Sequence, residues 1–300
     1  MLKVAWSKKY NHLLPANHRF PMIKYDLLPE QLLYEGTLKQ ENFFDPELID
    51  EYTILLTHEK PYWEKLKSLS LTKQEIRKTG FPLSEELLER EMIIMEGTVQ
   101  AATYAMEFGV ALNIAGGTHH AHTNKGEGFC LLNDNAIAAN YLLDMEMAGQ
   151  ILIVDLDVHQ GDGTAQIFQN DDRVFTFSMH GAGNFPMKKE VSDLDIALPD
   201  GIGDKEYLKI LDKNLKKLVD ELMPDFVFFQ SGVDVLASDK LGKLGLTIDG
   251  CKARDKMVLN ICKLHNIPLA ISMGGGYSEK IKDIVEAHAN TYRLAGEIFF

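Results

Sequence analysis

Short apolar runs alternate with amphipathic stretches over the last two thirds of the chain. The runs contain few polar breaks, which is typical of strands in a sheet that is covered on both faces. They lie at 110–115, 151–156, 174–179, 225–230 and 268–273. Helical spacing of apolar residues predicts helices at 83–108, 135–148, 205–223, 252–265 and 279–295. This alternation predicts an α/β fold with a parallel sheet and right-handed crossovers.

The first 80 residues carry a weaker pattern. They are polar and mixed, with short helical pieces such as 46–57, and Ser84 is placed to cap the long helix that follows. The chain has no internal repeat, no low-complexity tract and no linker rich in Pro, Gly or Ser. We therefore predict a single domain over residues 1–300.

Composition narrows the class of protein. Hydrophobic residues make up 45% and charged residues 25% of the 300 residues, which is typical of a globular domain. The net charge of −13 argues against direct binding to nucleic acid, which favours a basic face. It leaves room for an acidic rim that attracts a cationic substrate.

The cysteines and the apolar runs bear on the compartment. Three cysteines without a CxxC pair argue against a disulfide framework and against a structural zinc site of the cysteine type. No apolar run approaches the ~20 residues of a membrane helix, and no signal peptide is recognisable. These features predict a cytoplasmic protein with no membrane partner.

Polar, glycine-rich segments follow all five predicted strands. Ligands bind outside the carboxyl ends of strands in open α/β sheets, so we expect one site built from these loops. No GxSxG elbow, P-loop, GxGxxG or HExxH motif is present. The segments are GGTHH (116–120), DLDVHQGDG (155–163), MHG (179–181), SGVD (231–234) and GGGY (274–277).

A catalytic metal site is the first chemistry that these loops suggest. Asp157 and His159 follow one strand and Asp234 ends another. Two carboxylates and one imidazole suit Zn²⁺, or Fe²⁺, and leave a coordination position open. Either acid taken alone is better explained as a helix cap or a turn residue, and the prediction of a metal rests on the whole set.

The tandem His119 and His120 suggest proton transfer. Spare carboxylates at Asp155 and Asp162 would bind Nδ1 of each imidazole and leave Nε2 to take a proton from water.

Aromatic residues on the same loops admit two interpretations. Tyr277 follows three glycines and is suited either to donate to a developing oxyanion or to pack at a helix entry. Phe129 and Phe185 either pack two loops together or line a slot for a methylene chain.

Taken together, these motifs resemble those of the zinc-dependent histone deacetylase superfamily. The N-terminal NHRFPMIKYDLL (17–28) is most similar to the class IV branch and its bacterial relatives. Four further segments carry the resemblance: GGTHHAHTNKGEGFCLLND (116–134), ILIVDLDVHQGDGTAQIF (151–168), QSGVDVLASDKLGKLGLT (230–247) and SMGGGY (272–277).

The resemblance implies a three-layer arginase/deacetylase fold with a central, mostly parallel sheet of about eight strands. It also implies hydrolysis of an acyl-lysine amide by a metal-activated water, and a structural potassium ion. Each role falls on matching positions. The zinc ligands are Asp157, His159 and Asp234; the catalytic group is His119, His120, Asp155, Asp162 and Tyr277; the substrate channel is Phe129, Phe185, Gly128 and Gly275; the potassium site is Asp155, Asp157, His159, Ser178 and Met179.

Alternatives remain open at this stage. They are an acetylpolyamine amidohydrolase, a binuclear-manganese ureohydrolase on the same fold, and an acyl-lysine binding protein without turnover. Gly161 stands where the ureohydrolase needs a further carboxylate. The loop from 180 to 185 is short and the rim acid of class I has no clear counterpart, so the sequence preference of the substrate is not indicated. The sequence specifies neither the acyl chain length nor the oligomeric state.

Overall fold

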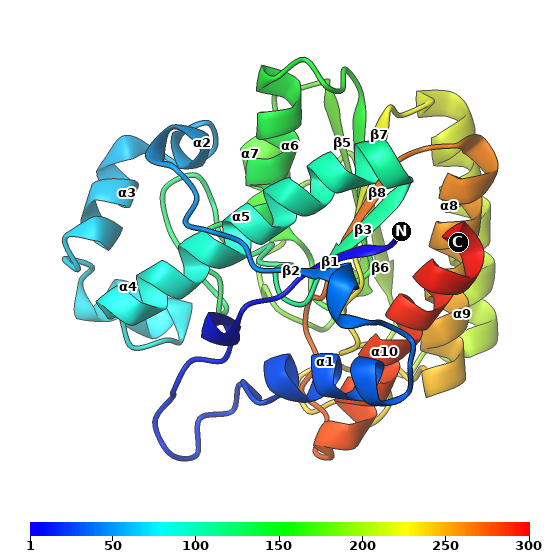
Figure 1. Ribbon diagram of the computed structural model, residues 1–300, viewed down its shortest axis with the longest axis horizontal. Coiled ribbons are helices and arrows are strands. Elements are labelled where there is room, and N and C mark those ends of the chain that lie inside the picture. Colours follow the sequence, from blue (N-terminus) through cyan, green and yellow to red (C-terminus); the bar gives the residue numbers. More distant parts are fainter.

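Eight parallel strands form one sheet in the computed structural model, which describes residues 1–300 (Figure 1). Their order across the sheet is β2-β1-β3-β8-β7-β4-β5-β6. The parallel sheet predicted from the sequence is confirmed, and no strand runs antiparallel. The strands are β1 (Lys3–Ala5), β2 (Phe43–Phe44), β3 (Val110–Asn113), β4 (Ile151–Asp155), β5 (Val174–Gly181), β6 (Leu194–Leu198), β7 (Phe226–Gln230) and β8 (Leu269–Ser272).

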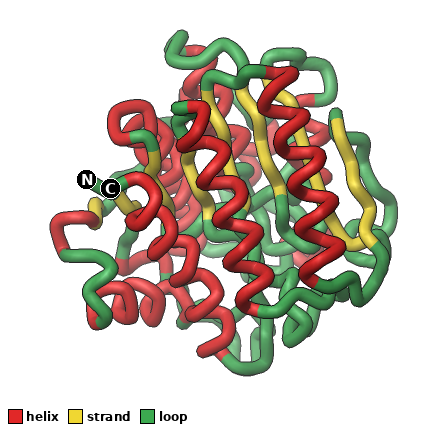
Figure 2. Tube along the Cα trace, turned by 90° about the vertical axis from the view of Figure 1, so that its right-hand side faces the viewer, coloured by secondary structure: helices red, strands yellow, loops and turns green.

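Helices cover both faces of the sheet, and Figure 2 shows one of these layers lying over the strands. One layer contains α2 (Glu51–Leu55), α5 (Glu85–Phe108), α6 (Asp134–Asp144) and α7 (Asp162–Phe168). The other contains α1 (Lys24–Tyr34), α8 (Asp204–Leu222), α9 (Ile248–His265) and α10 (Ile281–Phe299). Two short helices, α3 (Lys60–Lys67) and α4 (Lys73–Thr79), lie beside the first half of α5 (Figure 1). No helix has both the length and the apolar character that crossing a membrane demands.

The five predicted strands and the five long predicted helices are all present, with ends displaced by a few residues. The predicted helix at 46–57 is shorter and spans only Glu51–Leu55. Three strands, β1, β2 and β6, were not predicted from the sequence. β1 and β2 contain only three and two residues, and β6 lies at the sheet edge with four of its five residues only partly buried or exposed. Such segments carry no continuous apolar run, so the sequence pattern does not reveal them.

The centre of the sheet delivers the loops of interest to one edge. β3, β8, β7 and β4 are neighbours, and every residue in these four strands is buried. Burial on both faces explains their uninterrupted apolar sequences. Because the strands are parallel, their carboxyl ends meet at the same edge, where the segments 114–120, 156–163, 231–234 and 273–277 follow them.

The long helix α5 begins where the sequence predicts. The Ser84 hydroxyl accepts a hydrogen bond from the backbone N–H of Leu87 at 3.1 Å, and two glutamates occupy the first turn. Both features stabilise a helix N-terminus, where free N–H groups and the positive end of the dipole lie.

Candidate active site

A cavity of about 380 Å³ opens at the carboxyl edge of the sheet. Its lining brings together nine of the residues predicted from the sequence, although they come from four separate loops. They are His119, His120, Gly128, Phe129, Asp157, His159, Phe185, Gly275 and Tyr277. Asp155, Asp162 and Asp234 lie directly behind this lining and contact the histidines.

The three predicted metal ligands form a compact group. Donor atoms of Asp157, His159 and Asp234 all lie within 4.8 Å of one another. The Nδ1 atom of His159 is 3.1 Å from Oδ1 of Asp157 and 3.2 Å from Oδ2 of Asp234. Its hydrogen bond goes to Asp157, so Oδ2 of the fully buried Asp234 has no hydrogen-bond partner. One imidazole therefore serves two buried carboxylates.

The donor set fits a divalent cation. Burial and the neighbouring Asp157 raise the pKa of Asp234 to about 7, which reflects the cost of placing two negative charges together away from water. A buried carboxylate oxygen without a partner is unfavourable unless a cation binds it. Two carboxylates and one imidazole with an open side toward the cavity suit Zn²⁺ or Fe²⁺.

Backbone N–H groups hold the two carboxylates in place. The N–H of Gly275 donates to Oδ2 of Asp157 at 2.9 Å, and the N–H of Val158 donates to Oδ1 of Asp234 at 2.9 Å. A Cβ at position 275 would collide with the Asp234 carboxylate. The glycine lets the backbone approach both ligands, which no other residue type permits at this position.

Each histidine of the tandem pair has its own carboxylate. Nδ1 of His119 lies 2.7 Å from Oδ2 of Asp155, and Nδ1 of His120 lies 2.5 Å from Oδ1 of Asp162. The predicted pairings are thus present. Nε2 of His119 is 3.8 Å from Oδ1 of Asp157, whereas Nε2 of His120 has no hydrogen-bond partner in the protein. The contact with Asp162 fixes the tautomer of the His120 ring, and the free Nε2 of that ring faces the cavity.

The two imidazoles have different affinities for a proton. Burial lowers the pKa of His119, but the carboxylates of Asp155 and Asp157 outweigh it and raise this pKa to about 9. Burial and the neighbouring His119 lower the pKa of His120 to about 4, against the attraction of Asp162. A divalent cation on Asp157 would weaken one of the attractions that raise the pKa of His119.

Aromatic rings form the walls above these groups. The Tyr277 ring centroid lies 5.9 Å from that of Phe129, and the Phe185 ring meets His120 edge-on at 4.9 Å. Gly128 has a φ of +55°, and a Cβ there would lie 2.7 Å from Cδ2 of His120. Burial and then the charge of Asp234 raise the pKa of Tyr277 well above its usual range, so the phenol keeps its proton and can donate it in a hydrogen bond.

The predicted potassium ligands lie side by side. β5 pairs with β4 so that Ser178 stands opposite Asp155, and Met179 follows it. The backbone carbonyls of Asp157 and His159 accept no hydrogen bond within the protein. The Ser178 hydroxyl lies 3.0 Å from Nδ1 of His180.

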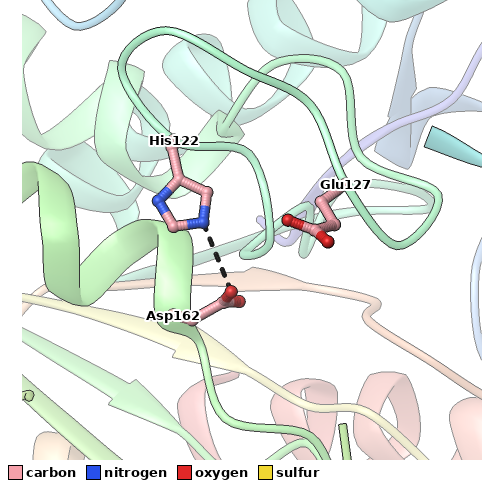
Figure 3. A group of neighbouring side chains, drawn as sticks. All are labelled: His122, Glu127 and Asp162. Carbon is pink, nitrogen blue, oxygen red and sulfur yellow. Dashed lines mark hydrogen bonds and ion pairs between the residues drawn. The ribbon is translucent and has the colours of Figure 1, made fainter. Parts of the chain in front are cut away.

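A second group of possible metal ligands, His122, Glu127 and Asp162, lies beside the histidine pair. Figure 3 shows these three side chains turned toward one another. Nε2 of His122 is 3.3 Å from Oδ2 of Asp162, which His120 also contacts, and the Glu127 carboxylate lies 3.0 Å from Nζ of Lys125. These interactions already satisfy the group, so it does not resemble the group of Asp157, His159 and Asp234, in which two buried carboxylates share one imidazole.

The histone deacetylase domain family matches residues 18–292 of this chain. The chain belongs to the histone deacetylase family. It is 44% identical over 296 residues to an uncharacterized protein of Picosynechococcus sp., with 99% of both chains covered. It is 27% identical over 277 residues to histone deacetylase 2 of Arabidopsis thaliana, covering 89% of this chain and 72% of that protein. The resemblance inferred from the motifs is confirmed.

The fold of this histone deacetylase family member is shared with solved structures. The crystal structure of an HDAC homolog complexed with SAHA has a TM-score of 0.86 and 26% identity, covering 98% of this chain and 84% of that one. The HDA15 HD domain has a TM-score of 0.84 at 20% identity, covering 99% and 88%. The arginase/deacetylase fold is thereby confirmed. Members of this family are hydrolases of the deacetylase type and are generally zinc-dependent.

Two residues that sequence reasoning missed support the tyrosine of this deacetylase. Oδ2 of Asp239 accepts a hydrogen bond from the backbone N–H of Tyr277 at 2.6 Å. Lys24 is fully buried, donates to the Gly274 carbonyl at 3.2 Å, and places Nζ 5.9 Å from the Tyr277 ring centroid. A lysine within the apolar helix start at 24–28 was a signal for Lys24, whereas nothing in the local sequence singles out Asp239.

A buried arginine joins the two strands that carry the metal ligands. Arg254 in α9 is fully buried; its Nη1 donates to the carbonyls of Leu156 at 3.1 Å and Gly232 at 2.5 Å, and its Nη2 to that of Ser231 at 3.1 Å. Asp255 balances its charge at 2.7 Å. Arg254 thus links the end of β4, just before Asp157, to the end of β7, just before Asp234.

Replacing Arg254 by methionine is expected to lower the free energy of unfolding by about 3–5 kcal/mol, because it leaves Asp255 and three carbonyls buried without their partner. Urea unfolding measures this loss. Lys256→Met, an exposed change two residues along α9, is the matched control. A loss no larger than that of the control would contradict the structural role of Arg254.

Proposed function

We propose that the protein is a zinc-dependent deacylase that hydrolyses the amide of N-acyl-lysine or of a small acylated amine. One observation carries the proposal: Asp157, His159 and Asp234, two buried carboxylates that share one imidazole, lie at the same cavity as a His–Asp pair that has a free Nε2. Family membership supports the deacetylase chemistry and the choice of zinc. Iron(II) suits the same donors.

Asp157, His159 and Asp234 would hold the metal, which supplies Lewis-acid activation of the amide carbonyl and of water. His120 accepts a proton from the attacking water at its free Nε2, since Asp162 occupies Nδ1. His119, paired with Asp155, holds a proton beside it for the departing amine. The Tyr277 phenol donates a hydrogen bond to the oxyanion that develops on the carbonyl. Phe129 and Phe185 enclose the methylene chain and exclude water.

The structural potassium ion is part of the same proposal. Asp155, Asp157, His159, Ser178 and Met179 would hold it. Free backbone carbonyls at Asp157 and His159 support this assignment, since potassium takes oxygen ligands and these two oxygens have no other partner. Bound there, the ion would fix the backbone of two zinc ligands.

The proposal extends to the location of the protein and to its partners. The three cysteines are free and buried, which suits the reducing cytoplasm. We assign the protein no nucleic-acid or membrane partner; its partner is the acylated amine itself.

The alternatives make different demands on the site. A binuclear ureohydrolase needs a second metal that shares carboxylates with the first. The only other group of suitable side chains, His122, Glu127 and Asp162, has no member in common with the first and is already satisfied internally. A binding protein without turnover needs none of the proton-transfer pairs. Both features favour the deacylase.

Purified protein with one equivalent of zinc tests the proposal against a panel of acetyl-lysine, longer acyl-lysine and acetylpolyamine substrates. We expect saturable release of the amine that a chelator abolishes and SAHA inhibits, since SAHA occupies the HDAC homolog of known structure. Binding without release would favour the binding protein. Urea release from a guanidino substrate with two equivalents of manganese would favour the ureohydrolase.

Replacing Tyr277 by phenylalanine is expected to lower kcat by on the order of 10²–10³, because one donor to the developing oxyanion is lost. Zinc affinity should stay within about twofold of wild type, since the phenol is not a ligand. Steady-state kinetics and zinc titration measure the two effects. Tyr62→Phe, which removes another buried phenol away from the cavity, is the control. Unchanged turnover in Tyr277→Phe would remove the phenol from the mechanism.

A further inference from the structure

Three cationic side chains surround the outer end of the cavity. Arg19 lies in the segment that precedes α1, Lys78 lies at the end of α4, and Lys243 lies in the loop between β7 and α9. All three are exposed, and all three line the cavity. We call Arg19, Lys78 and Lys243 the mouth cations.

Each mouth cation is tied to an aromatic wall. The Arg19 guanidinium lies 5.3 Å from the Phe129 ring centroid. The Lys78 carbonyl accepts a hydrogen bond from the N–H of Gly128 at 3.0 Å, next to Phe129. Nζ of Lys243 donates to the Gly183 carbonyl at 2.9 Å, two residues before Phe185. The charges of Arg19 and Lys243 are therefore held at the rim of the slot, and the backbone of Lys78 is fixed beside them.

Little negative charge offsets them. None of the mouth cations forms an ion pair within 4.0 Å, and Arg19 makes no hydrogen bond in the protein. Of the two carboxylates in the cavity lining, Asp157 is a buried metal-ligand candidate and Glu127 lies 3.0 Å from Lys125. Asp200 approaches the Lys243 ammonium across Gly183 and offsets part of that one charge.

The rim is thus basic in a protein whose net charge is −13. The sequence left room for an acidic rim, and the structure places the opposite charge there. Acidic side chains elsewhere on the molecule do not cancel this local excess, since exposed charges separated by more than about 8 Å are largely screened at physiological salt. A mouth of one sign attracts substrates of the other sign and repels those of its own.

We infer that the site prefers acylated amines that carry a carboxylate next to the acylated chain, outside the aromatic slot. The inference rests on the proposed function and adds the substrate class. A carboxylate there is either an acidic side chain that flanks an acyl-lysine in a peptide or the free α-carboxylate of an N-acyl amino acid. Lysine-rich segments and acetylpolyamines, which carry positive charge at this position, are poor substrates.

Matched substrates test the preference. The peptide arm compares acetyl-lysine flanked by Asp-Asp, Ser-Ser or Lys-Lys; the small-molecule arm compares Nε-acetyl-lysine with a free α-carboxylate against its amide, both with the α-amine blocked. At low salt we expect kcat/KM to be on the order of tenfold higher for the acidic member of an arm than for the neutral one, and the advantage to shrink in 0.5 M NaCl, where the Debye length is about 4 Å. The arm with the larger effect identifies the source of the carboxylate.

Charge reversal identifies the groups responsible. Arg19→Glu and Lys78→Glu should remove or reverse the ratio of kcat/KM between the acidic and the neutral peptide, because each replaces a cation of the cavity mouth by an anion. Lys256→Glu makes the same charge change on exposed α9, outside the cavity lining, and should preserve the preference.

Two outcomes separate failure of this inference from failure of the proposed function. Hydrolysis of all three peptides at equal kcat/KM would overturn the charge preference and leave the deacylase intact. Absence of hydrolysis would contradict the proposed deacylase function. In that case calorimetry measures the affinities of the same peptides, and their ratio tests the charge preference. Equal affinities for the acidic and basic peptides would overturn it there too.

Discussion

Asp234→Asn is expected to abolish zinc-dependent stabilisation and to lower kcat/KM by on the order of 10³-fold or more. Lewis-acid activation contributes several kcal/mol to transition-state stabilisation, and each 1.36 kcal/mol is about tenfold in rate. Asparagine keeps the size of the side chain and its hydrogen bond from the N–H of Val158. The loss therefore reports on the charged ligand rather than on packing.

The same variant has a distinctive effect on stability. Without zinc, Asp157 and Asp234 are two buried carboxylates that share one imidazole, so removing one charge is expected to leave stability unchanged or raise it. With zinc at 1,000 times its Kd, wild type should gain about 4 kcal/mol and the variant almost nothing. Thermal unfolding with and without zinc measures both effects. Asp220→Asn, an exposed change of the same charge on α8, is the control. An equal gain in Tm with zinc for variant and wild type would overturn the assignment of Asp234 as a ligand.

His120→Ala is expected to lower kcat by about 10²–10⁴, the range for loss of a general base. Its Nε2 is the free ring nitrogen of the histidine pair, and its Nδ1 is held by Asp162 at 2.5 Å. Zinc affinity should be retained, because His120 is not among the three ligands. Kinetics and zinc titration on the same preparation separate these two properties.

His122→Ala is the matched control for this prediction. His122 is equally buried and contacts the same carboxylate at 3.3 Å, yet it does not line the cavity. We expect it to change kcat by no more than a few fold. If both variants lose activity to the same extent, the general-base role belongs to the Asp162 network as a whole and not to His120.

The central strands could be predicted from the sequence because they are buried on both faces. An uninterrupted apolar run such as 226–229 can be read without tertiary information, and the long helix from Glu85 shows its cap and its period. β1, β2 and β6 could not be read in this way, because short or edge strands obtain their stability from the neighbour they pair with.

The site, too, contains residues that the sequence predicts and residues that only the structure reveals. Asp157 and His159 are close in sequence, so the motif itself predicts that they lie together. The adjacent His119 and His120 likewise predict a histidine pair without tertiary information. The partners that hold the site were less visible. Asp239 contacts Tyr277 across 38 positions of sequence, and Lys24 contacts Gly274 across 250. Such contacts depend on how separate loops converge, which local patterns do not encode.

The amino-acid sequence by itself determined the parallel α/β architecture, the family and the set of chemically active side chains. These properties follow from residue type and spacing, which burial and backbone geometry constrain locally. Only the tertiary structure decided that Asp234 keeps an oxygen without a partner, that His120 has the free ring nitrogen, and that three cations meet at the mouth of a negatively charged protein. Hydrogen bonding and electrostatic interaction depend on distances between atoms, and those distances exist only once the loops have been brought together at one edge of the sheet.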